Sequence, residues 1–392
     1  MNSQNTPVHL RLWHRDFLLM SLANMLMAVA VYILVPTMPE WLMQTEGFTP
    51  TEVAWSLGVF GLGLYLFGPF CTFLVQYYRR NRVCVIAMSF MALSVASLYY
   101  VQGMHSSSIQ LWVILLQRFL MGAFFGLAQM VLSSTLIIDT SESFQRTEAN
   151  YSSAWFSRFA LSIGPLVGLL SFRYFSFDVV LIASIACAVA AVLLVMTVRF
   201  PFRSPADDVQ LFSTDRFFLP RALPLFANLL IVSTVVGLLM SLGLSDRFYG
   251  MMMGGFLLAL LAQRFVFRNA ELKSEVVSGL ILLLAAVLLM YTRPRPIVWY
   301  IAPAFMGLAI GIIASRFLLF FIKLSRHCQR GTSQSTYFLG WETGIALGLW
   351  IGYACFFNNA DPLFLTAMVL IIAGLLMYQY FTHSWFIRNK NR

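Results

Sequence analysis

Twelve long apolar stretches dominate this chain, and each has enough residues, about 17 to 26, to cross the roughly 30 Å hydrocarbon core of a membrane as a helix. Only 11% of the 392 residues are charged, against about 25% in an ordinary soluble protein. The pattern predicts an all-α, multi-pass membrane protein and excludes a soluble domain. No stretch has the form of a cleavable signal peptide. The spans start near Phe17, Thr51, Val83, Gln110, Tyr151, Val179, Ala222, Met251, Val276, Val298, Thr332 and Pro362.

One connection divides the spans into two sets of six. Most connections are short, which suits antiparallel neighbours, but residues 199–221 form a longer polar segment with three prolines and three aspartates. We therefore expect a bundle of six helices in residues 1–198, a cytoplasmic linker in 199–221 and a second six-helix bundle in 222–392.

The distribution of Lys and Arg predicts the orientation. Nineteen of them lie on the side of the two termini, four lie on the opposite side, and three lie inside spans. By the positive-inside rule, both termini face the cytoplasm. The net charge of +10 is thus a topology signal, and a nucleic-acid partner is not needed to explain it. The short connections suit a bacterial inner membrane.

The two halves of the chain repeat each other. The fifth and eleventh spans match at a constant offset, which makes Glu342 the counterpart of Arg158. The fourth and tenth spans share a Gly-x-x-x-Gly spacing, a pattern common where membrane helices pack closely. Parallel repeats of this kind occur in secondary transporters, whose binding site lies between the halves near the midplane. The expected pseudo-symmetry therefore places a site where the two halves meet.

Charged residues inside spans are the first candidates for that site, because a charge at bilayer depth costs about 2.5 kcal/mol or more. Glu342 is the one carboxylate well inside an apolar span. It can carry a proton, contact a cationic substrate, or form a static salt bridge between the halves. Arg158 can bind an anionic group or pair with Glu342; alternatively it bonds to Asp139 or Glu148.

Two further arginines are deep enough to need an explanation. Arg118 lies about nine residues into its span, roughly 13 Å at 1.5 Å per residue. It is either a cation of the cavity or a structural residue that caps buried carbonyls. Arg316 lies near the cytoplasmic end of the tenth span, and we expect its long side chain to extend to the membrane surface.

Uncharged polar and aromatic residues form a second tier. Asn24 and Asn228 occupy matched places in the first and seventh spans, and either a cavity role or an interhelical hydrogen bond fits them. Trp155 and Trp341 lie within one turn of Arg158 and Glu342, where they can stack on a flat or cationic solute. The other residues expected to face inward are Gln129, Gln334 and Tyr337.

Three motif regions carry a resemblance to the major facilitator superfamily along essentially the whole chain. The fourth span has Arg118 followed by Gly122 and Gly126, and the fifth has Gly164-Pro165 and Gly168, similar to the Gly-Pro motif of the family's antiporters. The loop after the second span keeps the basic residues Arg80 and Arg82. It has Thr72 and Gln76 where the family usually has Gly and Asp, so the usual charge contact that holds the cytoplasmic gate closed is missing.

The resemblance implies alternating access around a cavity lined mainly by helices 1, 4, 7 and 10. It favours proton-coupled efflux of a small organic solute by a monomer in contact with membrane lipids. The two deep arginines of the first half against the one acid of the second half suit an anion, zwitterion or amphiphile as that solute. A solute/proton importer and a flippase for lipids or lipid-linked precursors remain alternatives. The chain has no catalytic triad, no phosphate-binding loop and no metal-ligand spacing, so we expect neither an enzyme nor a cofactor. The five cysteines fit buried hydrophobic positions.

Overall fold

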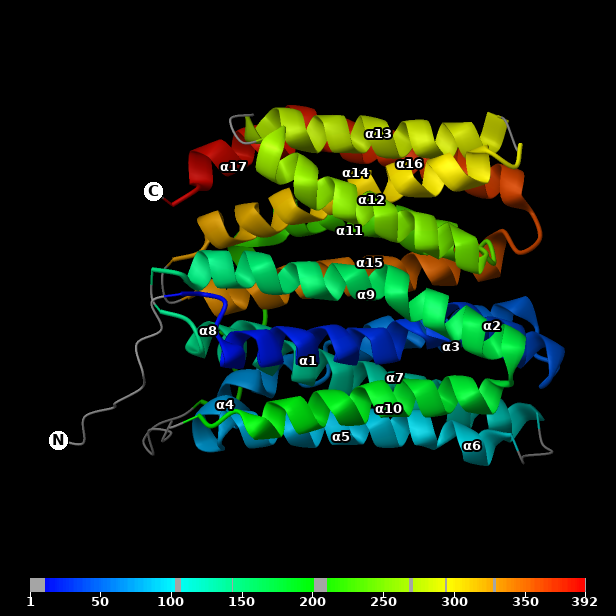
Figure 1. Cartoon of the computed structure of the whole chain (residues 1–392), viewed down its shortest axis with the longest axis horizontal. Helices are drawn as coiled ribbons and strands as arrows, with labels where there is room; N and C mark the ends of the chain where they lie inside the picture. The colour runs from blue at the N-terminus through cyan, green and yellow to red at the C-terminus, as the bar shows by residue number, and fades with distance from the viewer. Residues whose placement is uncertain are drawn as a thin grey trace.

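The computed structural model describes residues 11–102, 107–142, 144–200, 210–267, 271–292, 295–326 and 329–391. Within these residues the regular structure is helical, without strands. The long helices run side by side along one axis (Figure 1). The start of α1 and the short helix α17 lie at the same end of the bundle, on the left of Figure 1. The predicted all-α class is therefore confirmed.

The N-terminal half of the chain, up to residue 200, forms the first set of helices. Several spans are interrupted, so that one span contains more than one helix. The helices are α1 (Arg15–Tyr32), α2 (Leu34–Gln44), α3 (Pro50–Gly63), η1 (Gly68–Phe70), α4 (Cys71–Tyr77), α5 (Arg80–Ala96), α6 (Leu98–Val101), α7 (Ser107–Val131), the π-helix η2 (Leu132–Leu136), α8 (Ile137–Asp139), α9 (Arg146–Tyr174) and α10 (Phe177–Thr197).

The C-terminal half, from residue 210 onward, forms the second set. The helices are η3 (Pro220–Ala222), α11 (Leu223–Met240), α12 (Asp246–Phe265), α13 (Leu272–Thr292), α14 (Val298–Leu324), α15 (Arg330–Cys355), α16 (Ala360–Met377), the π-helix η5 (Tyr378–Thr382) and α17 (His383–Asn389).

Local sequence explains where several helices begin. The Thr49 side chain accepts a hydrogen bond from the Glu52 amide, and the Glu52 carboxylate accepts one from the Thr49 amide. This capping box, with Pro50 in the first turn, satisfies backbone donors that have no partner within the helix. At the start of α12 the Ser245 side chain accepts a hydrogen bond from the Phe248 amide.

Eleven helices in the described part of the chain are long and apolar enough to cross a membrane, against twelve predicted spans. The predicted span that is not long and apolar enough by this test of length and hydropathy is α15. It has 26 residues and is long enough, but its first half is rich in Gly, Ser, Thr and Gln and it contains Glu342. A helix that lies among other helices instead of in lipid can carry such residues.

The same packing order occurs in both halves. In the N-terminal half α1 packs on α9 and α10, α3 on α7, and α5 on α7 and α10. In the C-terminal half α11 packs on α15 and α16, α12 on α14, and α13 on α14 and α16. The correspondence makes α9 and α15 structural counterparts, as the sequence offset predicts.

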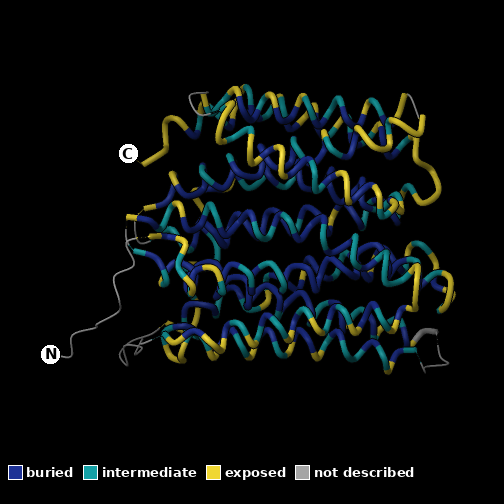
Figure 2. The backbone as a smooth tube through the Cα atoms, viewed as in Figure 1, coloured by how far each residue is buried: buried dark blue, intermediate teal, exposed yellow. Residues whose placement is uncertain are grey.

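Two long helix pairs join the halves. The helices α3 and α15 pack together, and α9 packs on α12, with smaller contacts of α9 with α14 and of α15 with α7 and η2. Figure 2 shows that the central helices are mostly buried, whereas exposed residues follow the outer helices at both edges of the view. The exposed residues there include many large apolar side chains, as expected for a surface that faces lipid.

Glycines allow the backbones of paired helices to approach closely. An added Cβ at Gly122 would lie 2.2 Å from the Phe60 carbonyl oxygen, and one at Gly126 would lie 2.7 Å from the Leu64 carbonyl oxygen. The matched Gly307 in α14 would contact the Met252 carbonyl oxygen at 2.1 Å. The Gly-x-x-x-Gly spacings therefore allow α7 to pack closely on α3, and α14 to pack closely on α12.

We expect Gly122→Val to destabilise the protein by about 3 kcal/mol or more, since the added side chain meets rigid backbone atoms. Thermal unfolding in detergent measures the loss. The matched control is Gly254→Val in α12, where a Cβ would meet nothing within 4 Å. Equal melting temperatures for the two variants would contradict this packing.

Candidate functional site

A small cavity of about 50 Å³ lies between the two halves. We call it the central cavity. Four elements of the N-terminal half line it, α1, α7, η2 and α9, while the C-terminal half contributes α15. Its lining residues are Asn24, Tyr32, Gln129, Ser133, Ala154, Ser157, Arg158, Gln334, Tyr337, Phe338, Trp341 and Glu342. Most of the polar residues predicted to face inward therefore meet at one place.

The expected set of cavity helices needs a correction. The family resemblance implies helices 1, 4, 7 and 10, which are α1, α7, α11 and α14 here. In this structure α1 and α7 line the central cavity, but α9 and α15 take the place of α11 and α14. The close pairing of α9 with α1 and of α15 with α11 brings these two helices to the centre.

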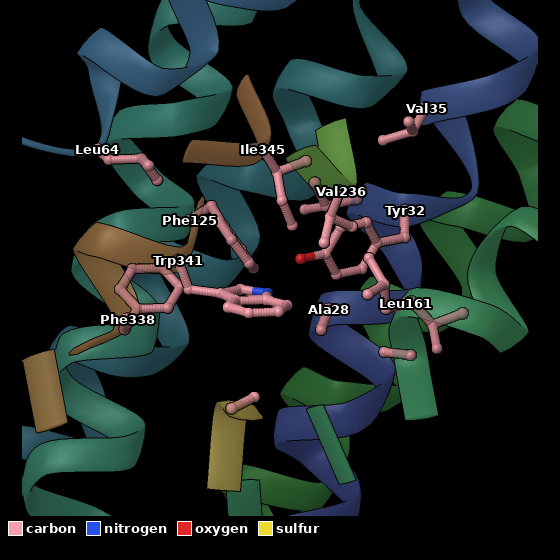
Figure 3. Close-up of a cluster of buried hydrophobic side chains, with 14 of the residues drawn as sticks. Ala28, Tyr32, Val35, Leu64, Phe125, Leu161, Val236, Phe338, Trp341 and Ile345 are labelled. Atoms are coloured by element: carbon pink, nitrogen blue, oxygen red, sulfur yellow. The ribbon is translucent and has the colours of Figure 1, made fainter. Parts of the chain in front are cut away.

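Glu342 is buried at the wall of the central cavity, with a relative exposure of 6%. Its Oε1 atom accepts a hydrogen bond of 2.7 Å from the Tyr32 hydroxyl, so a residue of α1 holds an acid of α15. Figure 3 shows Tyr32 among apolar side chains, with its hydroxyl pointing toward the side chains of α15, including Trp341. The carboxyl group is thus held in place by a neutral donor and remains on the cavity wall.

The Gly-Pro region of α9 positions that donor. Tyr32 is the last residue of α1. An added Cβ at Gly164 would lie 2.6 Å from the Tyr32 Cβ, and one at Gly168 would lie 2.3 Å from the Ile33 carbonyl oxygen. Pro165 lies between these glycines in the interior of α9. The region therefore supports the point where α1 ends and α2 begins.

Arg158 is the cation of the central cavity. Its Nη1 atom donates a 2.6 Å hydrogen bond to the Ser315 hydroxyl of α14, across the boundary between the halves. The Trp155 ring lies 4.8 Å from the guanidinium carbon, which is a favourable cation–π distance. The buried Nε and Nη2 atoms have no hydrogen-bond partner among the described residues.

Arg158 and Glu342 line the same cavity without pairing. The ion pairs found among the described residues do not join them. The proposed alternatives for Arg158 do not occur either, because Asp139 pairs with Arg80 and no ion pair with Glu148 is found in the described ranges. Arg158 interacts electrostatically with the Tyr337 hydroxyl and hydrogen-bonds Ser315. A fixed salt bridge is therefore absent from this part of the site, and both charged groups are available to a solute.

Amide groups add unpaired acceptors to the cavity wall. Asn24 donates through Nδ2 to the Ser157 hydroxyl at 2.7 Å, and its Oδ1 atom has no partner in the described residues. The Gln334 Oε1 atom is likewise buried and unpartnered there. Buried polar atoms are costly when unpaired, so a polar solute that bonds to them gains affinity.

Trp155 packs on Arg158 but does not line the central cavity. Two further residues of the predicted substrate pathway also lie outside it. Arg118 donates to the Ser56 carbonyl oxygen at 3.3 Å and lies 5.0 Å from the Phe60 ring, between α7 and α3. Asn228 donates to the Gly374 carbonyl oxygen of α16 at 3.0 Å, inside the C-terminal half. Both positions match the structural alternative, in which a buried polar side chain joins neighbouring helices.

Arg316 also differs from its prediction. It does not extend to the surface but forms an ion pair with Glu275 of α13. The Glu275 side chain is 1% exposed and that of Arg316 is 14% exposed. The pair links α13 to α14 within the C-terminal half, because a nearby carboxylate stabilises the charge better than a partial route to water.

We expect Glu275→Leu to destabilise the protein by about 3–5 kcal/mol, because it leaves a buried cation without its partner. The double variant Glu275→Leu with Arg316→Met is expected to recover most of that loss, since no buried charge remains. Thermal unfolding of the single and double variants measures both effects. Additive losses would show that the ion pair does not couple the two helices.

The structure also places the basic motif residues. Arg80 pairs with Asp139 at the cytoplasmic side predicted for the bundle, and Arg82 is exposed. Thr72 and Gln76 stand where the family has Gly and Asp, and Thr72 donates a 2.5 Å hydrogen bond to the carbonyl oxygen of Asp215 in the linker. Thr72 therefore joins the N-terminal half to the linker.

Sequence reasoning missed several residues of the site. Tyr32, Ser157 and Ser315 hold Glu342, Asn24 and Arg158, respectively. Hydroxyl residues of this kind are common in membrane helices, and nothing in their spacing distinguishes them from residues that bond to their own backbone. Ser133 lies on the π-helix η2, and π-helical turns often occur at functional sites. That turn is visible in the structure but not in the sequence.

Comparison with known proteins identifies the class. The family model of the Major Facilitator Superfamily matches residues 20–349, so the chain belongs to this superfamily of membrane transporters. No curated protein matches the chain by sequence. Family membership makes the protein a transporter and not an enzyme.

Solved structures share the fold at low sequence identity. The human organic anion transporter MFSD10 (TETRAN) has a TM-score of 0.66 at 14% identity, covering 93% of this chain and 98% of its own. The nucleoside transporter NupG has a TM-score of 0.65 at 13% identity, with 93% and 100% covered. A bacterial homologue of the iron transporter ferroportin in an outward-facing state has a TM-score of 0.69 at 11% identity, with 95% and 99% covered. Because one fold carries such different cargoes, the substrate has to be inferred from the residues of the site and not from the fold.

Proposed function

We propose that this protein is a secondary active transporter that moves a small organic anion or zwitterion by alternating access. The moving parts are residues 1–198 and 222–392, joined by the linker 199–221. The observation that carries the proposal is the central cavity between them, where Arg158 and Glu342 are both buried and do not pair.

The free edge of Arg158 favours a carboxylate-bearing solute. Nε and Nη2 are adjacent donors on one edge of the planar guanidinium, and neither makes a hydrogen bond of normal geometry to the described residues, although the Tyr337 hydroxyl lies close to the guanidinium group. A carboxylate accepts two parallel hydrogen bonds from such an edge. On the same wall Glu342, Asn24 Oδ1 and Gln334 Oε1 can accept from an ammonium or hydroxyl group. A zwitterion or a hydroxylated anion satisfies both sets.

The size of the cavity supports a cycle in which the halves separate. A volume of about 50 Å³ has room for a few waters, whereas pockets for organic ligands usually measure about 300–1,000 Å³. Contacts between α3 and α15 and between α9 and α12 join the two halves beside the site. Binding therefore requires the α3–α15 or α9–α12 contact to open, which is the motion that alternating access supplies.

Proton coupling is assigned to Glu342. A lone carboxyl group on the wall of a closed cavity changes its charge when it exchanges a proton, and the charge of the site changes with it. The resemblance of Gly164-Pro165 to the antiporter motif favours export in exchange for protons. The excess of basic residues at the end that holds both termini supports a cytoplasmic location for that end. We place the protein in a bacterial inner membrane as a monomer.

The direction of coupling is tested in vesicles that contain the purified protein and a pH-sensitive dye. Small carboxylates and zwitterions are added outside at equal internal and external pH. An antiporter exchanges entering solute for internal protons, so the internal pH rises. A symporter brings protons in with the solute, so the internal pH falls and the import alternative replaces export. Solute uptake without any change in internal pH would contradict proton coupling.

A further inference from the structure

A second cavity, of about 160 Å³, lies at the end of the bundle where α9 and α15 begin. We call it the basic cavity. Four arginines and one aspartate are among the residues that line it: Arg80, Asp139, Arg146, Arg216 and Arg330. It shares no lining residue with the central cavity, so the transported solute does not explain its charge.

Among the described residues, the positive charge of the basic cavity is only partly balanced by Asp139 and the neighbouring Asp215. Asp139 is engaged by Arg80. The buried Nε atom of Arg146 and the buried Nη1 atom of Arg216 have no hydrogen-bond partner among the described residues. Burial and the nearby positive charge of Arg80 lower the pKa of Arg216, and Asp215 offsets this in part. Buried cationic donors without acceptors are unfavourable, and an anion in the cavity would satisfy them.

The three parts of the molecule meet around this cavity. Arg80 and Arg146 belong to the N-terminal half, Arg330 to the C-terminal half and Arg216 to the linker. Arg216 has a φ of 59°, which is unfavourable for a residue other than glycine.

Hydrogen bonds to both halves hold the linker in that conformation. The Asp215 carbonyl oxygen accepts from Thr72, and the Arg216 amide donates 2.8 Å to the Thr332 hydroxyl. The Leu219 amide donates 2.8 Å to the Thr336 hydroxyl. The backbone at Arg216 is thus held at the junction of the two halves.

A thin wall separates the basic cavity from the central cavity. The π-helix η2 presents Ser133 to the central cavity and Ser134 and Thr135 to the basic cavity. On the other side of the junction, Gly331 packs on η2, since an added Cβ there would lie 2.6 Å from the Ser134 carbonyl oxygen. Anything that joins the arginines across this junction also holds the wall closed.

We propose that the basic cavity binds a phosphate group, which bridges Arg146, Arg216 and Arg330 and locks the two halves together at this end. A phosphate carries up to two negative charges and at least three acceptor oxygens, which suits several guanidinium groups that line one cavity better than a carboxylate does. The source is either free phosphate or the headgroup of an acidic lipid. The site regulates the proposed transport cycle, but binding itself requires no transport.

The test measures the melting temperature of the purified protein as inorganic phosphate is titrated against chloride at constant ionic strength. We expect a saturable rise in the wild type and in Arg221→Gln, an exposed arginine of the linker that does not line the cavity. In the double variant Arg146→Gln with Arg216→Gln, the apparent Kd should be at least about 10-fold weaker, because charge-assisted hydrogen bonds are lost. If the double variant does not fold, each single variant should show a smaller weakening.

A second arm compares lipid nanodiscs with and without phosphatidic acid. Stabilisation by phosphate alone identifies a soluble anion, and stabilisation by phosphatidic acid alone identifies a lipid headgroup; either supports the site. No saturable rise with either probe, or the same rise in the double variant, would overturn it.

The closing effect has a separate readout. In a protein whose five native cysteines are replaced by alanine, Ser133→Cys reports access to the central cavity. A water-soluble maleimide is added on the side of the protein that holds the basic cavity. Whichever of phosphate or phosphatidic acid stabilises the protein should slow the labelling of the Ser133→Cys variant. Unchanged labelling at saturating probe would overturn the lock. Neither readout depends on a transported solute, so failure here is distinguishable from failure of the proposed transport function.

Discussion

Replacement of Arg158 by glutamine is expected to weaken binding of the transported anion by about 100-fold or more. The variant removes two adjacent charged donors, and hydrogen bonds to charged groups contribute about 1.5–3 kcal/mol each, where 1.4 kcal/mol is a factor of ten. The fold should persist, because glutamine is uncharged and its amide can be buried at lower cost than a charge. Isothermal titration with a solute that stabilises the wild type measures the change.

Arg158→Lys separates charge from geometry. Lysine keeps the positive charge but lacks the paired donors of the guanidinium edge, so we expect an affinity between those of the wild type and Arg158→Gln. The control is Arg295→Gln, an exposed arginine in the connection before α14. Equal affinity in the wild type and Arg158→Gln would show that this arginine does not bind the solute.

Glu342→Gln is expected to abolish proton-driven transport and to preserve solute exchange. Glutamine has nearly the same shape and can still accept from the Tyr32 hydroxyl, so the packing of the site should remain. It cannot release a proton, and therefore the pH gradient should no longer drive accumulation, which falls to the level of protein-free vesicles. Exchange of labelled for unlabelled solute requires no net proton movement and should continue.

Two variants control for side effects of this change. Glu271→Gln removes an exposed acid near the start of α13 and should leave both activities unchanged. Tyr32→Phe removes the hydrogen bond but keeps the carboxyl group, so proton-driven transport should be reduced and not lost. Accumulation by Glu342→Gln at the wild-type rate would exclude the acid as the proton carrier.

The repeat in the sequence located the centre of the site. The constant offset that relates Arg158 to Glu342 comes from two halves that pack in the same order, so equivalent helices, α9 and α15, occupy equivalent places. Charge at bilayer depth then distinguishes these two positions from the apolar background, because burial of charge requires a reason. Depth and symmetry can both be read from one sequence.

The direction in which a side chain points could not be read from the sequence. When a span is apolar on all sides, its hydrophobic pattern does not distinguish the face that contacts lipid from the face that contacts protein. Asn24 and Asn228 illustrate this, since they occupy matched positions but one faces the central cavity and the other bonds to α16. Arg118 is similar, because it lies inside its span but packs against α3.

Contacts between segments far apart in the chain also could not be predicted from the sequence. Tyr32 and Glu342 are 310 residues apart, and the pairing depends on where α1 ends, which Gly164 and Gly168 of α9 help to set. The linker is another case, because its place between the halves follows from hydrogen bonds to Thr72, Thr332 and Thr336. Such contacts arise from the assembled fold and not from local spacing.

The most direct test of the central claim is a thermal-shift comparison of wild type and Arg158→Gln with a panel of small carboxylates, zwitterions, amines and neutral sugars. We expect the solutes that stabilise the wild type to carry a carboxylate, and the stabilisation to be lost in Arg158→Gln but kept in Arg295→Gln. Stabilisation by amines or sugars lacking a carboxylate, to the same extent in wild type and Arg158→Gln, would contradict a site built around Arg158.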